Sequence, residues 1–401
     1  MLEFILAILA GIFIGIITGI TPGIHINTIT ALLIVNIAYF SFAPTNAIIA
    51  FIVSLAIAHT ILDFIPSILT GATDEESFLS VLPGHEMLIQ GKGREAILLV
   101  VLGAITSIPL ILVITPIFIK AVPFVYENIE YSIPFILIFI SIYTITRETK
   151  VFTALIVFLA TGFLGYSSLN LPVENALLPL LGGLFGASSI IISLNQKLKL
   201  PKQEKFKFPK LNEIKKDYFK SIIGSLISSP FCSFLPAIGS GHAATISSEI
   251  IPQSRKSFLM MLGTINIIVM TLSFVTLYTL NRTRTGAAAA IKSIIQEISL
   301  TNLWTIILIV IISIICSSII SLLITNIFIK TIEKINYSLV STIMLLILIT
   351  AVIVLSNPLG IVVFITSTAW GIFAIKSNIR RINMMGVLLI PTIIIYLTNY
   401  V

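Results

Sequence analysis

The sequence feature that most limits the possible folds of this chain is an uncharged run. Positions 303–329 are 27 residues without one charged side chain. An α-helix needs about 20 apolar residues to cross the hydrocarbon core of a bilayer, so this run is long enough to span it. Over the whole chain, 57% of the 401 residues are hydrophobic and 10% are charged. Soluble domains carry about 25% charged residues. We therefore predict an all-α polytopic membrane protein, a multi-pass protein of the cell membrane.

The apolar segments form two series of seven, which predicts two repeats. We expect a first transmembrane repeat over 1–194, a basic cytoplasmic linker over 195–220 and a second transmembrane repeat over 221–401. Thr70-Gly71-Ala72 in the first half recurs in register as Thr285-Gly286-Ala287 in the second. The segments lie at 2–20, 24–42, 44–70, 95–122, 131–146, 150–166 and 174–194, and at 218–235, 241–254, 257–281, 303–329, 336–355, 357–375 and 382–400.

The distribution of basic residues predicts the orientation of the two halves. The linker carries nine lysines and is expected to be a solvated cytoplasmic tether, because cytoplasmic loops are enriched in Lys and Arg. Segment 44–70 then runs inward and its counterpart 257–281 runs outward, so the repeats have inverted topology and both termini are external. The formal charge of +7 lies mainly in the linker and short loops, and we expect no nucleic-acid partner.

Four basic residues disagree with this orientation, because it places them on the outer side. Two explanations stay open: the topology is wrong around 282–292, or these side chains are held in a site instead of in a loop. The four are Lys120, Arg282, Arg284 and Lys292.

Each half begins with a helix that is broken by proline and glycine. A broken helix at membrane depth exposes main-chain groups that lipid cannot satisfy, so it faces protein or a watery cavity. Paired breaks in two halves indicate the binding site of a secondary transporter. The helix that starts after each break presents a positive N-terminus that suits an anion. The residues expected to bind substrate are Pro22, Gly23, Asn27 and Thr28 at the first break, and Gly239, Ser240, Gly241 and Thr245 at the second.

The alternative interpretation of the breaks is a pair of kinks packed against neighbouring helices. Whether each broken pair spans the membrane or forms a re-entrant hairpin is open from the sequence alone. Two of the four histidines, His25 and His242, follow the two breaks. They can bind an anion when protonated or relay a proton, or they can be hydrogen-bonded residues of a helix interface.

Three polar residues are candidates for ion coupling. Asp63 lies in the apolar run 44–70, and an intramembrane carboxylate is a candidate ligand for Na⁺ or a proton. Its position late in that run also fits the headgroup level. Asn266 lies inside segment 257–281, and Asp74 belongs to an acidic stretch that can coordinate a cation or be a solvated loop.

The chain resembles the large membrane subunit family of the tripartite tricarboxylate transporters, in particular its divergent archaeal branch. Three features carry the resemblance: the paired breaks, the stretch Leu82-Pro83-Gly84-His85-Glu86 with the Gly-centred turn after it, and the Gly-rich run Leu181-Gly182-Gly183-Leu184-Phe185-Gly186. The resemblance implies a permease that moves carboxylates by cation symport. It also implies a small membrane subunit and an extracytoplasmic binding protein as partners. The broken, inverted design is similar to that of polyprenyl-phosphate transporters as well, whose substrate is a lipid anion.

We therefore expect a secondary active transporter of an organic anion, a carboxylate, with Na⁺ or H⁺ symport and alternating access. The alternative is a transporter or flippase of a polyprenyl-phosphate-type lipid anion. We expect no enzyme and no cofactor, since no catalytic serine motif accompanies the compact pair His59 and Asp63. Membrane lipids are expected to surround the protein, and a second copy of the chain is a candidate partner in a homodimer.

Overall fold

The computed structural model describes residues 2–21, 29–30, 33, 43–71, 81–195, 201–206, 211–295, 297–334 and 337–399. Over this part of the chain the protein is helical and contains no strand. Ten helical stretches are long and apolar enough to cross a membrane. The prediction of an all-α, multi-pass membrane protein is therefore confirmed.

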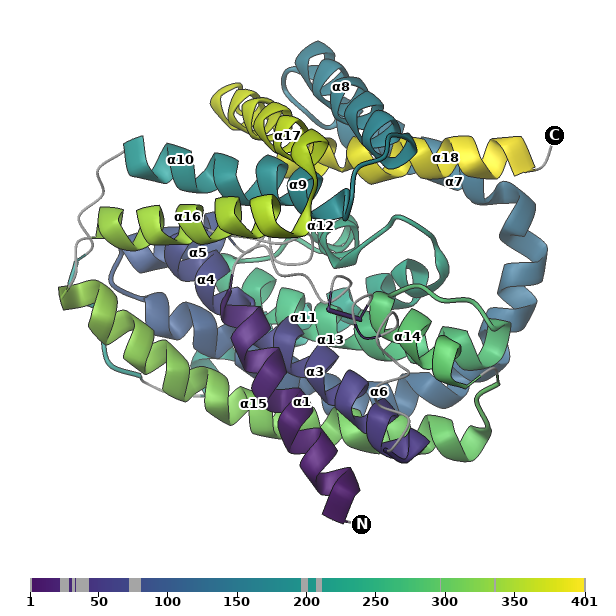
Figure 1. Cartoon of the computed structure of the whole chain (residues 1–401). Helices are drawn as coiled ribbons and strands as arrows, with labels where there is room; N and C mark the ends of the chain where they lie inside the picture. Colours follow the sequence, from purple (N-terminus) through teal and green to yellow (C-terminus); the bar gives the residue numbers. More distant parts are fainter. Residues whose placement is uncertain are drawn as a thin grey trace.

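The first half contains α1 (Leu2–Ile20), α3 (Thr45–Leu62), α4 (Phe64–Thr70), α5 (Val81–Ile89), α6 (Gly93–Ile129), η3 (Glu130–Ser132), α7 (Ile133–Thr146), α8 (Val151–Asn170), α9 (Leu177–Leu181), the π-helical η4 (Gly182–Ala187) and α10 (Ser188–Asn195). The second half contains α11 (Leu211–Phe234), α12 (Ser240–Ile250), α13 (Arg255–Leu280), α14 (Gly286–Ile294), α15 (Leu300–Lys334), α16 (Tyr337–Leu355), α17 (Pro358–Lys376), η5 (Arg381–Met385) and α18 (Gly386–Asn399). Figure 1 shows α8, α17 and α18 gathered at one end of the molecule, while α1 points away at the opposite end.

The outer surface of the helices is strongly apolar, as expected for a protein that faces lipid. Phe139 on α7 is 68% exposed and Phe163 on α8 is 72% exposed. The interior is built around α3 and α13, where nearly all residues are buried. These two helices are equivalent in the predicted repeat, and each packs against the long helix of the fourth segment in the other half: α13 on α6 and α3 on α15.

Two glycines bring the main chains of α6 and α13 into direct contact. A Cβ atom on Gly263 would lie 2.1 Å from the carbonyl oxygen of Val100. A Cβ atom on Gly103 would lie 2.0 Å from the carbonyl oxygen of Met260. Because real Cβ atoms do not approach an oxygen this closely, only glycine permits the crossing at both points. The same contact is fastened by the Thr264 hydroxyl, which donates to the Gly103 carbonyl at 2.9 Å.

The last helices of the two halves repeat this exchange of partners. At the crossing of α8 with α18, a Cβ atom on Gly165 would lie 1.9 Å from the carbonyl oxygen of Val387. At the crossing of α17 with η4, a Cβ atom on Gly371 would lie 2.3 Å from the carbonyl oxygen of Leu184. In the predicted repeat α8 corresponds to α17, and α18 to the segment that holds η4. Equivalent helices therefore cross equivalent partners, while the inversion itself stays a prediction from the charge pattern.

Part of the linker is fixed to the protein, which differs from the expected solvated tether. Gln203 is 6% exposed, and its Oε1 accepts a hydrogen bond from the Gly93 N–H at 2.9 Å. Its main-chain N–H donates to the Glu333 Oε1 at 2.9 Å. Arg94 donates to the Gln203 carbonyl at 3.1 Å. A tether was expected because nine lysines lie in this segment and cytoplasmic loops are rich in Lys and Arg, but Gln203 supplies both a donor and an acceptor to the turn before α6. The linker also ends early, since α11 begins at Leu211.

Candidate functional site

Helices α11 and α12 form a hairpin whose two ends meet at its base. Lys220 near the start of α11 donates to the Pro252 carbonyl at 2.7 Å, just after α12. Asp217 accepts a hydrogen bond from the Ser254 hydroxyl at 2.7 Å. The 11 residues of α12 extend about 16 Å, well short of the hydrocarbon core of about 30 Å. The second broken pair therefore folds back as a helical hairpin with the predicted break at its tip, which favours the re-entrant alternative.

The tip reaches the far end of α13. Thr276, in the last turns of that helix, donates its hydroxyl to the Ser233 carbonyl at 3.2 Å. Ala237 in the turn has a φ of 58°, in the left-handed region that residues with a Cβ rarely adopt. The N-cap of α12 is Gly239. Glycine has no side chain to accept from the first N–H groups of the helix, so the positive end of α12 is left for another acceptor.

Arg284 fixes the shape of the tip. Its guanidinium donates to the carbonyl oxygens of Leu235 and Ile238, on either side of Pro236. The next residue, Thr285, is the N-cap of α14 and accepts from the Ala288 N–H at 3.2 Å. The N-termini of α12 and α14 are thus held at the same place by consecutive residues of one short segment.

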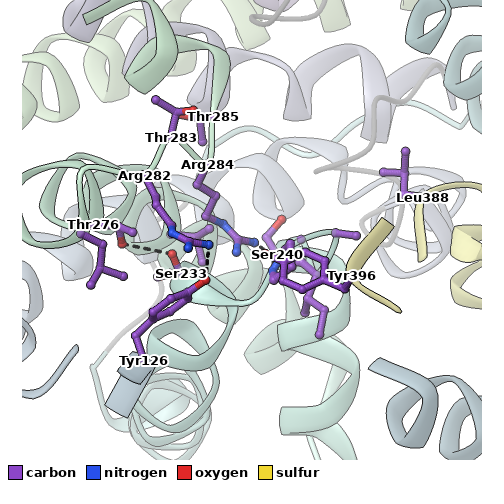
Figure 2. Close-up of a pocket in the computed structure, with 16 residues that line it drawn as sticks. Tyr126, Ser233, Ser240, Thr276, Arg282, Thr283, Arg284, Thr285, Leu388 and Tyr396 are labelled. Atoms are coloured by element: carbon purple, nitrogen blue, oxygen red, sulfur yellow. Dashed lines mark hydrogen bonds between the residues drawn. The ribbon is translucent and has the colours of Figure 1, made fainter. Parts of the chain in front are cut away.

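A cavity of about 290 Å³ lies at this tip. Figure 2 shows Arg282 and Arg284 extending from one side toward Ser233 and Ser240, with Tyr126 and Tyr396 on the other side. Tyr126 comes from α6 and Tyr396 from α18, so distant parts of the chain close the cavity. Its remaining wall consists of the hairpin turn, the end of α13 and the segment 282–285.

The cavity is positively charged on balance. Arg282 donates to the Glu130 Oε1 at 2.6 Å and to the Tyr126 hydroxyl, and its guanidinium lies 4.6 Å from the centre of the Tyr126 ring. Glu130 thus offsets one of the two arginines. The two helix N-termini add further positive potential. An anionic group is the ligand that this arrangement suits.

The residues predicted at the second break divide between the tip and the interior. Gly239 and Ser240 line the cavity. Gly241 and His242 are buried behind it, and neither ring nitrogen of His242 has a hydrogen-bond partner among the described residues. Thr245 lies one turn further along α12 and lines a different cavity, with its hydroxyl donating to the Gly241 carbonyl at 3.0 Å.

The residues predicted at the first break, Pro22, Gly23, His25, Asn27 and Thr28, lie outside the described residues, as does Asp74.

The structure places the other two ion-coupling candidates inside the protein. Asp63 is 6% exposed between α3 and α4, where the Ser67 hydroxyl lies 3.4 Å from its Oδ1. Asn266 is 2% exposed in α13. A Cβ atom on Gly19, at the end of α1, would lie 3.2 Å from the Asp63 nitrogen, so Asp63 adjoins the chain that leads into the first break. In the described part of the chain, no three His, Cys, Asp or Glu residues group as a metal site would require.

Comparison with known proteins decides the family. The model of the tripartite tricarboxylate transporter TctA family matches residues 5–386. The chain belongs to this family. An uncharacterized protein of Methanocaldococcus jannaschii is similar, with 32% identity over 406 residues that cover 98% of this chain and 99% of that protein. No solved structure matches.

The TctA family consists of transporters rather than enzymes, which is consistent with the expectation from the sequence. TctA proteins are the large subunits of tripartite transporters, which generally include a small membrane subunit and a binding protein. Sequence analysis noticed Arg282 and Arg284 only because they violate the charge rule, and the structure favours the second of its two explanations: both are held in a site. It missed Tyr126 and Tyr396, which no local pattern distinguishes from other aromatic residues of apolar helices.

Proposed function

We propose that this protein is a secondary active transporter that binds an organic anion, a carboxylate, in the cavity at the tip of the α11–α12 hairpin. The convergence of Arg282 and Arg284 on the glycine-capped N-terminus of α12 is the observation that carries the proposal. A carboxylate placed there can accept from main-chain N–H groups and the Ser240 hydroxyl. The bidentate fork of a guanidinium suits the same group.

The two arginines have different roles in this proposal. Arg284 donates hydrogen bonds to the carbonyls of Leu235 and Ile238. It thereby holds the tip in the shape that presents the N-terminus of α12. Arg282 is shared with Glu130, and an arriving carboxylate competes with that glutamate. Competition of this kind gives a site that releases its ligand, as transport requires.

Cation coupling is proposed for Asp63. Its carboxylate is buried beside the Ser67 hydroxyl, next to the end of α1. A buried carboxylate in a membrane protein is stabilised by a cation or a proton. Binding of Na⁺ or H⁺ there would order the chain that leads into the first break, where the predicted residues Asn27 and Thr28 lie. The two breaks would then enclose the anion, and movement of one repeat against the other would alternate its access.

Thermal unfolding of the purified protein tests this function. Citrate, succinate and a prenyl phosphate are compared, each with and without Na⁺ and across pH. A ligand at about 100 times its dissociation constant stabilises the folded state by roughly 2.7 kcal/mol. We expect stabilisation by a di- or tricarboxylate that increases with Na⁺ or at low pH. Stabilisation by the prenyl phosphate alone would replace the carboxylate with a lipid anion, and no response to any anion would reject the site.

A small membrane subunit and an extracytoplasmic binding protein are proposed partners of this chain. The residues that line the cavity come from distant parts of this chain, from α6 to α18. We therefore expect the purified large subunit to bind the anion by itself. Vectorial uptake from dilute solution would need the binding protein.

A further inference from the structure

A second and larger cavity, of about 760 Å³, lies at the base of the same hairpin. Its wall combines the second half of α12, the turn into α13, the connection from α17 to η5, and Pro83 of α5. This is the end of the hairpin where Lys220 and Asp217 contact the chain after α12. Basic residues concentrate at this end, which the charge rule assigns to the cytoplasm.

Three arginines line this cavity, and two of them are neutralised. Arg255 pairs with Glu86 at 2.8 Å, and Arg380 pairs with Glu148 at 2.7 Å. Arg381 differs, because no carboxylate of the described residues pairs with it. Its Nη1 is enclosed by protein and has no hydrogen-bond partner among those residues. The Arg381 side chain as a whole is partly exposed and lines the cavity, so its other guanidinium N–H groups can donate to an anion that is not part of the chain.

Helix α12 connects the two cavities. Its first residue, Ser240, lines the cavity at the tip, and Thr245 and Ser248 line the cavity at the base. Eight residues of helix separate Ser240 from Ser248, which corresponds to about 12 Å. Between them His242 is 1% exposed. The two cavities therefore lie at opposite ends of one short helix, with a buried residue between them.

We propose that the cavity at the base is a second binding site for the transported carboxylate, with the Arg381 guanidinium as its main ligand. The hydroxyls of Thr245 and Ser248 and the amide of Gln253 supply further polar contacts. This inference rests on the proposed function, since it assigns a cytoplasmic station to the same anion. The anion passes from the tip to the base, α12 forms the barrier between the two sites, and both sites can be filled at the same time.

Equilibrium binding to the purified full chain in detergent tests the second site. Radiolabelled citrate, succinate and inorganic phosphate are the probes, each used separately. We expect two sites per chain in the wild-type protein and one in Arg381→Gln. Lys376→Gln is the matched control: it removes a nearby exposed positive charge that does not line the cavity, and it should keep both sites. Arg381→Lys should weaken binding at this site at least tenfold, because an ammonium cannot replace the planar fork.

The unliganded melting temperature provides an independent readout. Arg381 has no carboxylate partner among the described residues that its removal would leave unpaired. Arg381→Gln should therefore melt at the wild-type temperature or above it. A clear decrease would show that Arg381 has a partner in the protein and would overturn the proposal.

Three binding results would also overturn the second site. They differ in whether they reject the proposed function as well. One site that is lost in Ser240→Ala and kept in Arg381→Gln rejects the second site and leaves the proposed function intact. No binding of any probe rejects both. An anionic lipid headgroup has the same chemistry as the probes, so binding is repeated in phosphatidylcholine and phosphatidylglycerol nanodiscs. Loss of the Arg381-dependent site only in phosphatidylglycerol would assign it to lipid instead of the transported anion.

Discussion

Arg284 donates a hydrogen bond to the main-chain carbonyl of Ile238, and this contact ties the segment before α14 to the tip of the hairpin. The carbonyls of Leu235 and Ile238 lie in the turn between α11 and α12, outside either helix, and so need another donor. A guanidinium meets this need and also carries positive charge to the site. The shape of the tip and its electrostatic potential thus depend on one side chain.

Replacement of Arg284 should therefore affect both stability and transport. Arg284→Gln removes a charged donor from two carbonyls, and hydrogen bonds to charged groups contribute about 1.5–3 kcal/mol each. We expect a lower melting temperature and a loss of anion uptake into proteoliposomes of at least tenfold. Arg147→Gln is the control, since Arg147 is 55% exposed and lies away from the cavity. Wild-type uptake in Arg284→Gln would show that the tip does not need this residue.

Ser240→Ala should lower transport without loss of folded protein. Ser240, the first residue of α12, lines the cavity, and alanine is compatible with a helix at this position. The same effect is predicted from the sequence for Asn27→Ala at the first break. Thr366→Ala, on the exposed face of α17, should transport normally. Unchanged uptake in both site variants, measured at equal amounts of folded protein, would remove the hairpin tip from the transport path.

Gly263→Ala should separate α6 from α13 and destabilise the protein. The new Cβ atom would lie 2.1 Å from the carbonyl oxygen of Val100, which belongs to a rigid helix main chain. Overpacking of this kind costs typically about 1–3 kcal/mol. Gly182→Ala is the control, because its Cβ atom would lie 3.2 Å from the flexible end of Leu348. Thermal unfolding of both variants makes the comparison, and equal melting temperatures would mean that the crossing can relax.

Stability should also depend on pH through His85, which lies on α5 outside the ten candidate spans. Burial lowers the pKa of His85 from its ordinary 6.5, a hydrogen bond that the ring donates to the main chain of Ile68 raises it, and the nearby charge of Arg381 lowers it again. Below pH 6.5 the unfolded chain gains a proton that the folded protein does not accept. The free energy of unfolding should therefore decrease as the pH falls below about 6.5.

His85→Gln tests this dependence, because glutamine keeps hydrogen-bonding capacity and does not titrate. The variant should lose part of the decrease in melting temperature between pH 7 and pH 5. If wild type and variant show the same profile, the acid sensitivity comes from other groups, such as the paired glutamates at the base of the hairpin.

The sequence predicted the parts of this protein that depend on local pattern. Apolar runs located the spanning helices, and proline with glycine located the second break at Pro236–Gly241. The sequence did not decide whether the second broken pair spans the membrane or folds back as a hairpin. That outcome depends on contacts such as that of Lys220 with Pro252, which no run of apolar residues encodes. Arg282 and Arg284 left a signal as charges on the wrong side. Tyr126 and Arg381 left none, since their role arises from helices that meet only in the folded chain.

The expectation for the linker was wrong for a related reason. The lysine-rich composition of segment 201–206 indicates that its side chains are solvated. Its contacts with the rest of the protein are instead made by Gln203 and the main chain beside it. A single buried amide cannot be recognised in a polar stretch without its partners.

The crossing of α8 with α18 also bears on how this protein is made. Gly165 lies against the main chain of Val387, so the packing surface of α8 is completed by a helix that follows much later in the chain. Soluble multidomain chains generally fold one unit at a time from the N-terminus as they leave the ribosome. Here the first seven segments insert into the membrane while their partners are still untranslated. Native packing of the N-terminal half must therefore wait for the synthesis of α18.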